Sequence, residues 1–474
     1  MALKRLHLSK KMRIGLINPN QNLKDAAIHL GLGYLASYAR QHHLDLEFKL
    51  LDTRIAHRKD FENFFSQAYD LFAFTASCQV FDEAIEMAEK LKQSYPETPI
   101  CIGGSHASTE KERCLAGYPF DFAIYGEGEQ TFSELIAYFK GEKELESIHG
   151  LIYKDESGKI YINTPRSLIL NIDEIPFPAY DLFEMKKYPQ HRLTTSRGCP
   201  YNCVFCNSSS LWTHKWRKRS PENIFAEIRF LIKHFGRKTV IFNDDSFNID
   251  AKRVIEFCNL LIEKKLGIIW STSIRVDLVT QEIADFMFKS GCYNVSVGIE
   301  SANDEVLKRM NKNTTREKIY AGIQMLREAG IDVMGQFMIG NPGDNLESVK
   351  ESIEFARTSN LTGVEFYTAL PYRDSLLWEF VEEHGKLLTD AEPYRYHNFR
   401  PRIIFETPEF PFDDRLKAIE LAGKNGFYHA LTHDEKNVLL DGGRIMAQSI
   451  QKIMKGKSGN KLYLGLRKVY RNFK

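Results

Sequence analysis

The chain has 474 residues, of which 43% are hydrophobic and 27% charged, an ordinary globular composition that excludes wholesale disorder and collagen-like structure. At roughly 150 residues per domain, this length predicts about three domains. The 64 Lys and Arg nearly balance the 62 Asp and Glu, so the net charge of +2 gives no case for nucleic-acid binding. No apolar run approaches the length of a spanning helix and no secretory signal is evident, so we expect a cytoplasmic protein.

The first part of the chain predicts a doubly wound parallel sheet. Short apolar runs alternate with helical patterns, and the predicted strands span residues 12–17, 46–51, 71–75, 99–102 and 122–125. Gly-rich turns follow the last two strands, at the sheet edge where folds of this kind bind ligands. We therefore expect a Rossmann-type domain over residues 12–145.

Residues 146–190 read as an ordered linker, with a hairpin turn at Ser157-Gly158 and a Pro-rich run that cannot be helical inside. From residue 191 to 385, helical patterns separate six further strands, which predicts a partial (β/α)6 barrel with its chemistry at the strand C-termini. These strands are expected at residues 193–196, 239–242, 268–271, 294–298, 333–339 and 363–367. Residues 386–474 are expected to form a mainly helical C-terminal region.

Three of the eight cysteines lie close together, directly after the first barrel strand. Cys199, Cys203 and Cys206 have the spacing Cys-x3-Cys-x2-Cys, which lets three thiolates hold three irons of a 4Fe–4S cluster and leaves the fourth iron open. A structural zinc site is the alternative, and it would need a fourth ligand such as His214. The other cysteines are scattered in apolar segments, where buried structural thiols are expected.

The segment from Arg197 to Cys206 resembles the radical S-adenosylmethionine superfamily, and the chain is most similar to its cobalamin-binding subgroup. The turns Gly103-Gly104-Ser105-His106 and Gly126-Glu127-Gly128-Glu129 carry the same resemblance in the first domain. The resemblance implies that the open iron chelates S-adenosylmethionine and that electron transfer from the cluster releases a 5′-deoxyadenosyl radical. The implied cofactors are thus a 4Fe–4S cluster, S-adenosylmethionine and cobalamin.

The resemblance also implies which barrel residues lie near S-adenosylmethionine. Phe205 would pack near the adenine, and Gly340 would let the backbone approach it. Asp244 and Asp245 would lie near the methionine ammonium, where a helix-capping turn is the alternative. The remaining two are Arg275, for the methionine carboxylate or an ordinary ion pair, and Glu300, for the ribose hydroxyls.

For cobalamin, the resemblance implies residues on the turns after the third, fourth and fifth strands. They are Thr75, Ser77, Gly103, Gly104, His106, Gly126, Glu127 and Gly128. The Asp-x-His-x-x-Gly motif that supplies an axial imidazole in many cobalamin enzymes is missing from the loop after the first strand. The alternative is therefore a cobalamin fold that no longer binds its cofactor.

The leading functional hypothesis is a cobalamin-dependent radical enzyme that transfers a methyl group to an unactivated carbon, or catalyses a rearrangement or ring formation there. No catalytic residue is predicted beyond the cluster site. A cobalamin-independent radical enzyme and a non-enzymatic iron–sulfur sensing protein remain alternatives. A methylthiotransferase is disfavoured because Cys78, Cys101 and Cys114 lie on separate elements. We expect a small-molecule or lipid-linked substrate and a reductase, flavodoxin or ferredoxin as electron donor.

The C-terminal tail is basic and amphipathic. Residues 455–474 contain seven basic residues and no acidic ones, with an apolar stripe at helical spacing. Such a helix can contact an anionic membrane surface, or it can pack its stripe on the barrel with its cations in water. Peripheral membrane contact is therefore one of two expectations for this segment.

Overall fold

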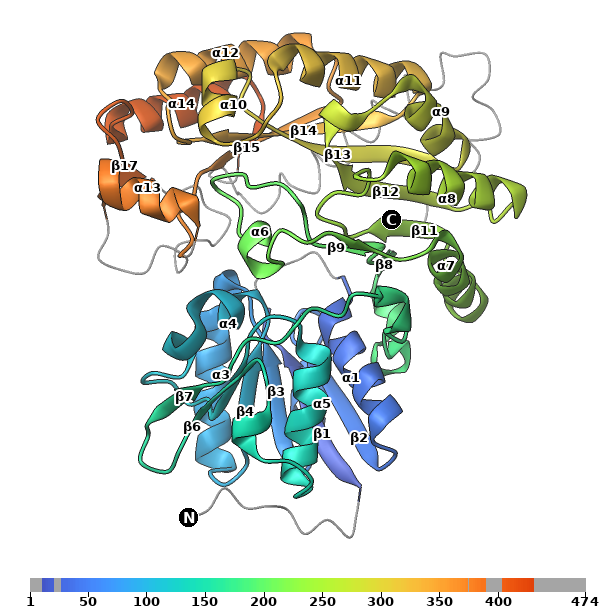
Figure 1. Ribbon diagram of the computed structural model, residues 1–474, viewed down its shortest axis with the longest axis vertical. Coiled ribbons are helices and arrows are strands. Elements are labelled where there is room, and N and C mark those ends of the chain that lie inside the picture. Colours follow the sequence, from blue (N-terminus) through green and yellow to red (C-terminus); the bar gives the residue numbers. More distant parts are fainter. Residues whose placement is uncertain (1–10, 21–26, 374, 389–402, 430–474) are drawn as a thin grey trace.

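Two α/β units, each built on its own seven-stranded sheet, lie one above the other in this computed structural model (Figure 1). The structure describes residues 11–20, 27–373, 375–388 and 403–429. The first unit occupies the lower half of Figure 1 and the second the upper half, with the cluster loop running between them.

The first sheet has the strand order β2-β1-β3-β4-β5-β6-β7. Its first five strands are parallel, and the last two are antiparallel. All five strands expected in this half of the chain are present. The bounds are β1 Met12–Asn18, β2 Leu46–Asp52, β3 Leu71–Thr75, β4 Ile100–Gly103, β5 Phe122–Ile124, β6 Leu151–Lys154 and β7 Ile160–Ile162.

Helices cover both faces of this sheet. The core on one face takes apolar side chains from α1 and α5, and the core on the other face takes them from α2 and α3. Because β1 lies between β2 and β3, the winding reverses direction there and opens a crevice at the strand C-termini. The helices are α1 Leu30–His42, α2 Arg58–Phe65, α3 Phe81–Ser94, α4 Ser105–Glu110 and α5 Gly128–Phe139.

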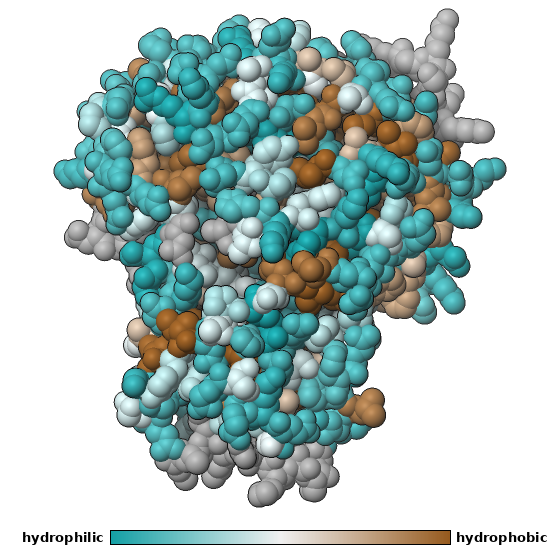
Figure 2. All heavy atoms as spheres, viewed as in Figure 1, coloured by the Kyte–Doolittle hydropathy of each residue, from teal (hydrophilic) through white to brown (hydrophobic). Residues whose placement is uncertain are grey.

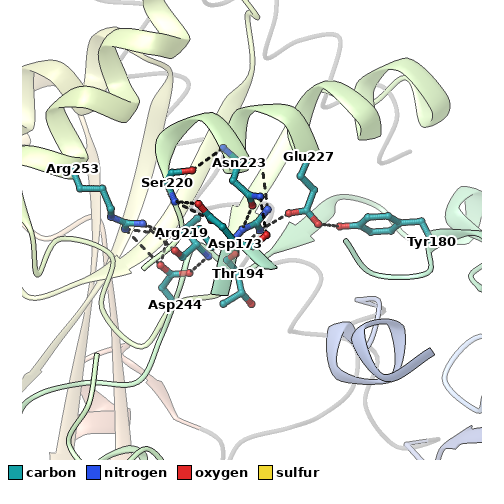
Figure 3. Close-up of polar contacts among 10 residues, drawn as sticks. Asp173, Tyr180, Thr194, Arg219, Ser220, Asn223, Glu227, Asp244 and Arg253 are labelled. Carbon is teal, nitrogen blue, oxygen red and sulfur yellow. Dashed lines mark hydrogen bonds and ion pairs between the residues drawn. The ribbon is translucent and has the colours of Figure 1, made fainter. Parts of the chain in front are cut away.

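The segment between the units divides into two parts. The expected hairpin is present as β6 and β7, and it extends the first sheet through the antiparallel pairing of β5 with β6. The residues after this hairpin form hydrogen bonds with the N-terminal half of α7 (Pro221–Phe235) and its cap in the second unit (Figure 3). Asp173 accepts a hydrogen bond from the Ser220 backbone N–H at 3.0 Å, and the Tyr180 hydroxyl donates to Glu227 at 2.6 Å. The same Glu227 carboxylate pairs with Arg219, so this junction is polar, buried and internally satisfied.

The second sheet is entirely parallel and has the order β18-β15-β14-β13-β12-β11-β8. It curves over the first unit, with its helices on the outer side, as expected of a partial barrel (Figure 1). Six strands confirm the sequence-based expectation, whereas β18 is a seventh contributed by the C-terminal region. The bounds are β8 His191–Leu193, β11 Thr239–Phe242, β12 Ile269–Ile274, β13 Cys292–Glu300, β14 Asp332–Ile339, β15 Gly363–Thr368 and β18 Tyr428–His429.

The outer helices bury one apolar face each against this sheet. α7 shows the local signals clearly, because Ser220 caps its first turn, Pro221 begins it and Gly236 ends it in the left-handed conformation. The remaining helices are α6 Ser208–Leu211, α8 Ala251–Glu263, α9 Gln281–Lys289, α10 Asp304–Arg309, α11 Arg316–Ala329, α12 Leu346–Thr358, α13 Leu376–His384 and α14 Phe412–Lys424. Two small antiparallel pairs complete the fold: β9 Ser196–Arg197 with β10 Arg217–Lys218, and β16 Lys386–Leu387 with β17 Phe405–Glu406.

The surface shown in Figure 2 is mostly hydrophilic, with brown patches distributed among charged and polar residues. Exposed large apolar side chains come from separate elements, such as Leu44 after α1 and Leu170 between the units. Within the described residues, no helix combines the length and apolarity needed to cross a bilayer. The expected amphipathic helix over 455–474 lies outside the described residues.

Candidate active site

The three clustered cysteines lie on one loop between β9 and α6, at the junction of the two units (Figure 1). Cys203 is 8% exposed, while Cys199 and Cys206 are half-buried, and none of the three forms a disulfide. Gly198 begins the loop at φ 88°, where a Cβ would collide with the Lys215 carbonyl. The loop therefore turns tightly because a glycine stands directly before the first cysteine.

Burial raises the pKa of all three thiols, that of Cys206 to about 11. Isolated thiolates are thus unfavourable here, and their formation needs the positive charge of bound iron. The cations Lys312 and Arg275 act in the opposite direction and lower the pKa of Cys203. Three sulfur donors beside two cations suit an anionic iron–sulfur cluster.

A single metal ion needs a different arrangement of protein ligands from a 4Fe–4S cluster. Among the residues that the structure describes, no three His, Cys, Asp or Glu side chains converge as one ion would require. A 4Fe–4S cluster instead takes each thiolate on a different iron, so its ligands stand further apart.

The two carboxylates that follow β11 have different environments. Asp244 accepts hydrogen bonds from the Thr195 backbone N–H and the Ser196 hydroxyl, both at 2.7 Å, and lies beside Arg253 (Figure 3). Asp245 is exposed and accepts a hydrogen bond from the Ser208 hydroxyl at 2.6 Å. Asp244 thus ties β8 to the turn after β11, while Asp245 faces the cavity beside the cluster loop.

Arg275 and Glu300 both contact Lys312. The Arg275 guanidinium pairs with Asp277 at 2.8 Å, donates to the Lys312 carbonyl at 2.7 Å and stacks on the Tyr201 ring at 3.7 Å. Glu300 pairs with the Lys312 ammonium at 3.1 Å and has a φ of +67°. A non-glycine residue in this conformation is uncommon, so the bulge at the end of β13 holds Glu300 in a strained position.

Gly340 ends β14 in a turn that the C-terminal region supports. At φ 104° its N–H donates to Asp344 at 2.8 Å, and a Cβ there would collide with the Arg415 guanidinium of α14. Burial raises the pKa of Asp344 to about 6. Phe205, on the cluster loop, is half-buried and packs against the barrel core, with the Lys312 ammonium 5.9 Å from its ring.

A cavity of about 490 Å³ opens at the C-terminal edge of the first sheet, between the two units. Gly104 shapes it, because at φ +99° a Cβ there would lie 2.6 Å from the Ala76 carbonyl oxygen. Six residues that the resemblance implies for cobalamin line this cavity: Thr75, Gly103, Gly104, Gly126, Glu127 and Gly128. A cradle of glycines fits a bulky, flat cofactor that the backbone must approach closely.

The other two residues implied for cobalamin lie elsewhere. Ser77 is not among the residues that line the cavity, and neither is His106, which is buried with its ring 3.8 Å from that of Phe81. A histidine that sequence reasoning missed does line it. His29, after the first strand, accepts a hydrogen bond from the Leu32 N–H and contacts the Thr75 hydroxyl at 3.2 Å.

An ion-pair network joins the cluster loop to the first unit, and sequence reasoning missed it. Arg197, two residues before Cys199, pairs with Glu127 at 2.9 Å and with Glu129 at 2.6 Å. Arg217 pairs with the same Glu127 at 2.8 Å. The Glu127 carboxylate is thus occupied by two arginines, so this residue bridges the Gly-rich turn and the cluster loop.

Comparisons with known proteins agree with this geometry. The B12 binding domain family matches residues 21–136, and the radical SAM superfamily matches residues 193–356. An uncharacterized methyltransferase of Pyrococcus horikoshii is 35% identical over 370 residues, which cover 76% of this chain and 80% of the relative. The chain belongs to the cobalamin-binding radical S-adenosylmethionine family.

Other family members are more distant. The cytidylyl-2-hydroxyethylphosphonate methyltransferase of Streptomyces wedmorensis is 28% identical, and the match covers 63% of this chain and 64% of that protein. The radical methyltransferase TsrM of Kitasatospora setae, solved with cobalamin and a [4Fe-4S] cluster, has a TM-score of 0.72 at 17% identity. That match covers 88% of this chain and 91% of TsrM, and it shows the shared fold.

Family membership confirms the predicted class, that of a radical S-adenosylmethionine enzyme with a 4Fe–4S cluster and a cobalamin domain. It favours this class over the cobalamin-independent enzyme and over the sensing protein. The individual roles implied for the site residues stay predictions.

Proposed function

We propose that the protein transfers a methyl group from S-adenosylmethionine to a carbon atom of a small-molecule substrate, with cobalamin as the methyl carrier. The relatives named above include two methyltransferases, which supports methyl transfer. Magnesium-protoporphyrin IX monomethyl ester cyclases are also among the similar proteins, so ring formation is the second candidate reaction. A flavodoxin, ferredoxin or reductase would supply the electrons.

One observation carries the proposal. The cavity between the units is lined from one side by the Gly-rich turns of the first sheet and from the other by Arg197, Gly198 and Asp245 of the cluster side. A cofactor held by the turns therefore faces the mouth of the barrel directly. Two cofactors that share one reaction need this proximity, because a transferred group must not escape into water.

When bound, the cluster supplies the electron that cleaves the sulfonium of S-adenosylmethionine, and cobalamin supplies a carrier for a methyl group. Cys199, Cys203 and Cys206 would hold the cluster, and Asp245 would accept from the methionine ammonium. Glu300 is held by Lys312 and can accept from the ribose, while Gly340 leaves room for the adenine. Glu127 and Arg197 keep the two halves of the site together.

The test uses the purified, anaerobically reconstituted protein. With excess hydroxocobalamin it should retain close to one corrinoid per chain, and with dithionite it should convert S-adenosylmethionine to 5′-deoxyadenosine. Retention of no corrinoid would favour the cobalamin-independent enzyme. Retention of both cofactors without any cleavage would favour a sensing protein.

A further inference from the structure

The inner wall of the barrel is polar, although its outer wall is apolar. On β12 and β13 the side chains that face the helices include Trp270, Val295 and Val297, all fully buried. The alternate positions on the same strands are Ser271, Ser273, Asn294 and Ser296, which face the lumen. Because neighbouring residues of a strand point to opposite faces, this alternation is built into both strands.

A cavity of about 480 Å³ follows this wall. Only Ile241 and Phe242 among its lining residues are apolar; the others are Gln190, Asn243, Asp244, Asp245, Ser271, Thr272, Ser273, Tyr293, Asn294 and Ser296. Binding sites for small molecules are usually lined mainly by apolar side chains, so this lumen departs from the common pattern. Its polar atoms need partners from whatever fills it.

On the far strands of the lumen, beyond the residues that line this cavity, polar side chains share the inner faces of β14 and β15 with Met334 and Met338. On β15, Phe366 packs outward against Phe337, and Glu365 and Tyr367 take the opposite face. The Glu365 carboxylate accepts hydrogen bonds from the Tyr367 hydroxyl and, at 3.4 Å, from the Gln336 side chain.

This carboxylate lies apart from the residues implied for S-adenosylmethionine. Glu300 ends β13 and Gly340 directly follows the end of β14, whereas Glu365 lies inside β15 and pairs with Gln336, four residues before Gly340. Glu365 is therefore available to a second molecule in the lumen. A carboxylate enclosed by a ligand loses its water, and the ligand must return hydrogen-bond donors to it.

Resting on the proposed function, we propose that the lumen binds a small polar substrate whose hydroxyl or amino hydrogens donate to Glu365. Tyr367 and Gln336 orient the carboxylate by donating to one of its oxygens. A lipid-linked substrate, one of the expectations from the sequence, is disfavoured because its chain would leave the serines and asparagines of the wall without partners. The substrate class is thus a polyol, an amine or an amino alcohol.

The experiment offers the reduced, fully reconstituted enzyme two extracts of its own source cells, one aqueous and one in chloroform. S-adenosylmethionine with a trideuterated methyl group provides the label, and mass spectrometry detects it in either extract. Glu365→Gln removes the charge and keeps the shape. Glu354→Gln is the matched control, because Glu354 lies on the outer helix α12 with its side chain 61% exposed.

We expect the label in the aqueous extract, with about a tenfold or larger loss in Glu365→Gln and no loss in Glu354→Gln. Corrinoid content and the cluster spectrum should be unchanged in both variants. If Glu365→Gln fails to fold, Tyr367→Phe carries the test, since it removes one donor without changing charge. Label in the chloroform extract alone, or equal labelling by Glu365→Gln and wild type, would overturn the inference. Label in neither extract, with 5′-deoxyadenosine still formed, would instead refute the proposed methyl transfer on which it rests.

Discussion

Cys203 is the most enclosed thiol of the cluster loop, with Lys312 and Arg275 beside it. The surroundings of this one side chain determine how readily its thiolate forms. Burial makes a thiolate costly unless a positive partner is bound, so the folded loop and the cluster depend on one another.

Replacing Cys203 by Ala should abolish the 4Fe–4S spectrum and all cleavage of S-adenosylmethionine, because two thiolates do not secure the cluster. Absorbance and 5′-deoxyadenosine formation measure both effects. Cys258→Ala is the control, since Cys258 is buried in the barrel core and should keep the cluster. Full cleavage activity in Cys203→Ala would exclude the assigned ligands.

His29 predicts a pH dependence of stability. Burial, aided by Arg54, lowers its pKa from 6.5 to about 4. Between these values the unfolded chain binds a proton that the folded chain does not, so stability falls as the pH drops from 6.5 to 4. The loss is up to about 3 kcal/mol, at about 1.4 kcal/mol per pH unit.

His29→Gln should therefore lose less stability than wild type between pH 7 and pH 4.5, measured by the thermal midpoint. His42→Gln, on the exposed end of the same helix, should behave like wild type. An equal loss in His29→Gln and wild type would show that this imidazole does not titrate as a buried group.

Among the elements of the first unit, one turn and one ion-pair network shape the site. The turn from β4 into α4 depends on Gly104, and the contact between the units depends on Glu127. Both features couple the first sheet to the barrel mouth, and each can be altered separately.

Gly104→Ala should weaken cobalamin retention at least about tenfold and leave the cluster intact, because the added Cβ meets the Ala76 carbonyl oxygen at 2.6 Å. Gly117→Ala is the matched control. Gly117 also has a positive φ, 76°, but no atom lies within 4 Å of its added Cβ. It should cost about 1 to 2 kcal/mol of stability and keep cobalamin. Equal retention by the two variants would remove Gly104 from the cofactor site.

Glu127→Gln should loosen the contact between the units, because Arg217 and one side of Arg197 lose their carboxylate. Pulsed EPR between cob(II)alamin and the reduced cluster measures the effect as a broader distance distribution. Glu134→Gln, which removes a carboxylate of α5 paired with Arg166 and Lys143, is the control. An unchanged distribution in Glu127→Gln would show that other contacts set the distance.

For the whole molecule, local patterns predicted most of the architecture. Every strand expected before residue 385 is present, because short apolar runs between helical patterns are a strong local signal. β18 was not expected, since a strand of only Tyr428–His429 carries no period. The bond between Arg197 and Glu127 was also beyond prediction, because these residues lie 70 positions apart and meet only after both units fold.

The site, like the fold, has features that local sequence predicts and features that depend on contacts formed only after folding. The cysteine spacing is local and predicted the cluster loop. The difference between the environments of Asp244 and Asp245 instead depends on residues that are brought beside them by folding. The polar inner wall did have a signal in the sequence. The alternation Glu365-Phe366-Tyr367 marks a strand with one polar face, and the corresponding serines of β12 do the same.

In the proposed reaction, one chain uses S-adenosylmethionine both as a methyl donor to cobalamin and as a radical source. The most direct measurement incubates reconstituted enzyme, cobalamin and reductant with S-adenosylmethionine carrying a trideuterated methyl group. We expect both S-adenosylhomocysteine and 5′-deoxyadenosine, with the deuterated methyl recovered on the corrinoid. Formation of 5′-deoxyadenosine alone, with no label on the corrinoid and no S-adenosylhomocysteine, would contradict the proposed reaction.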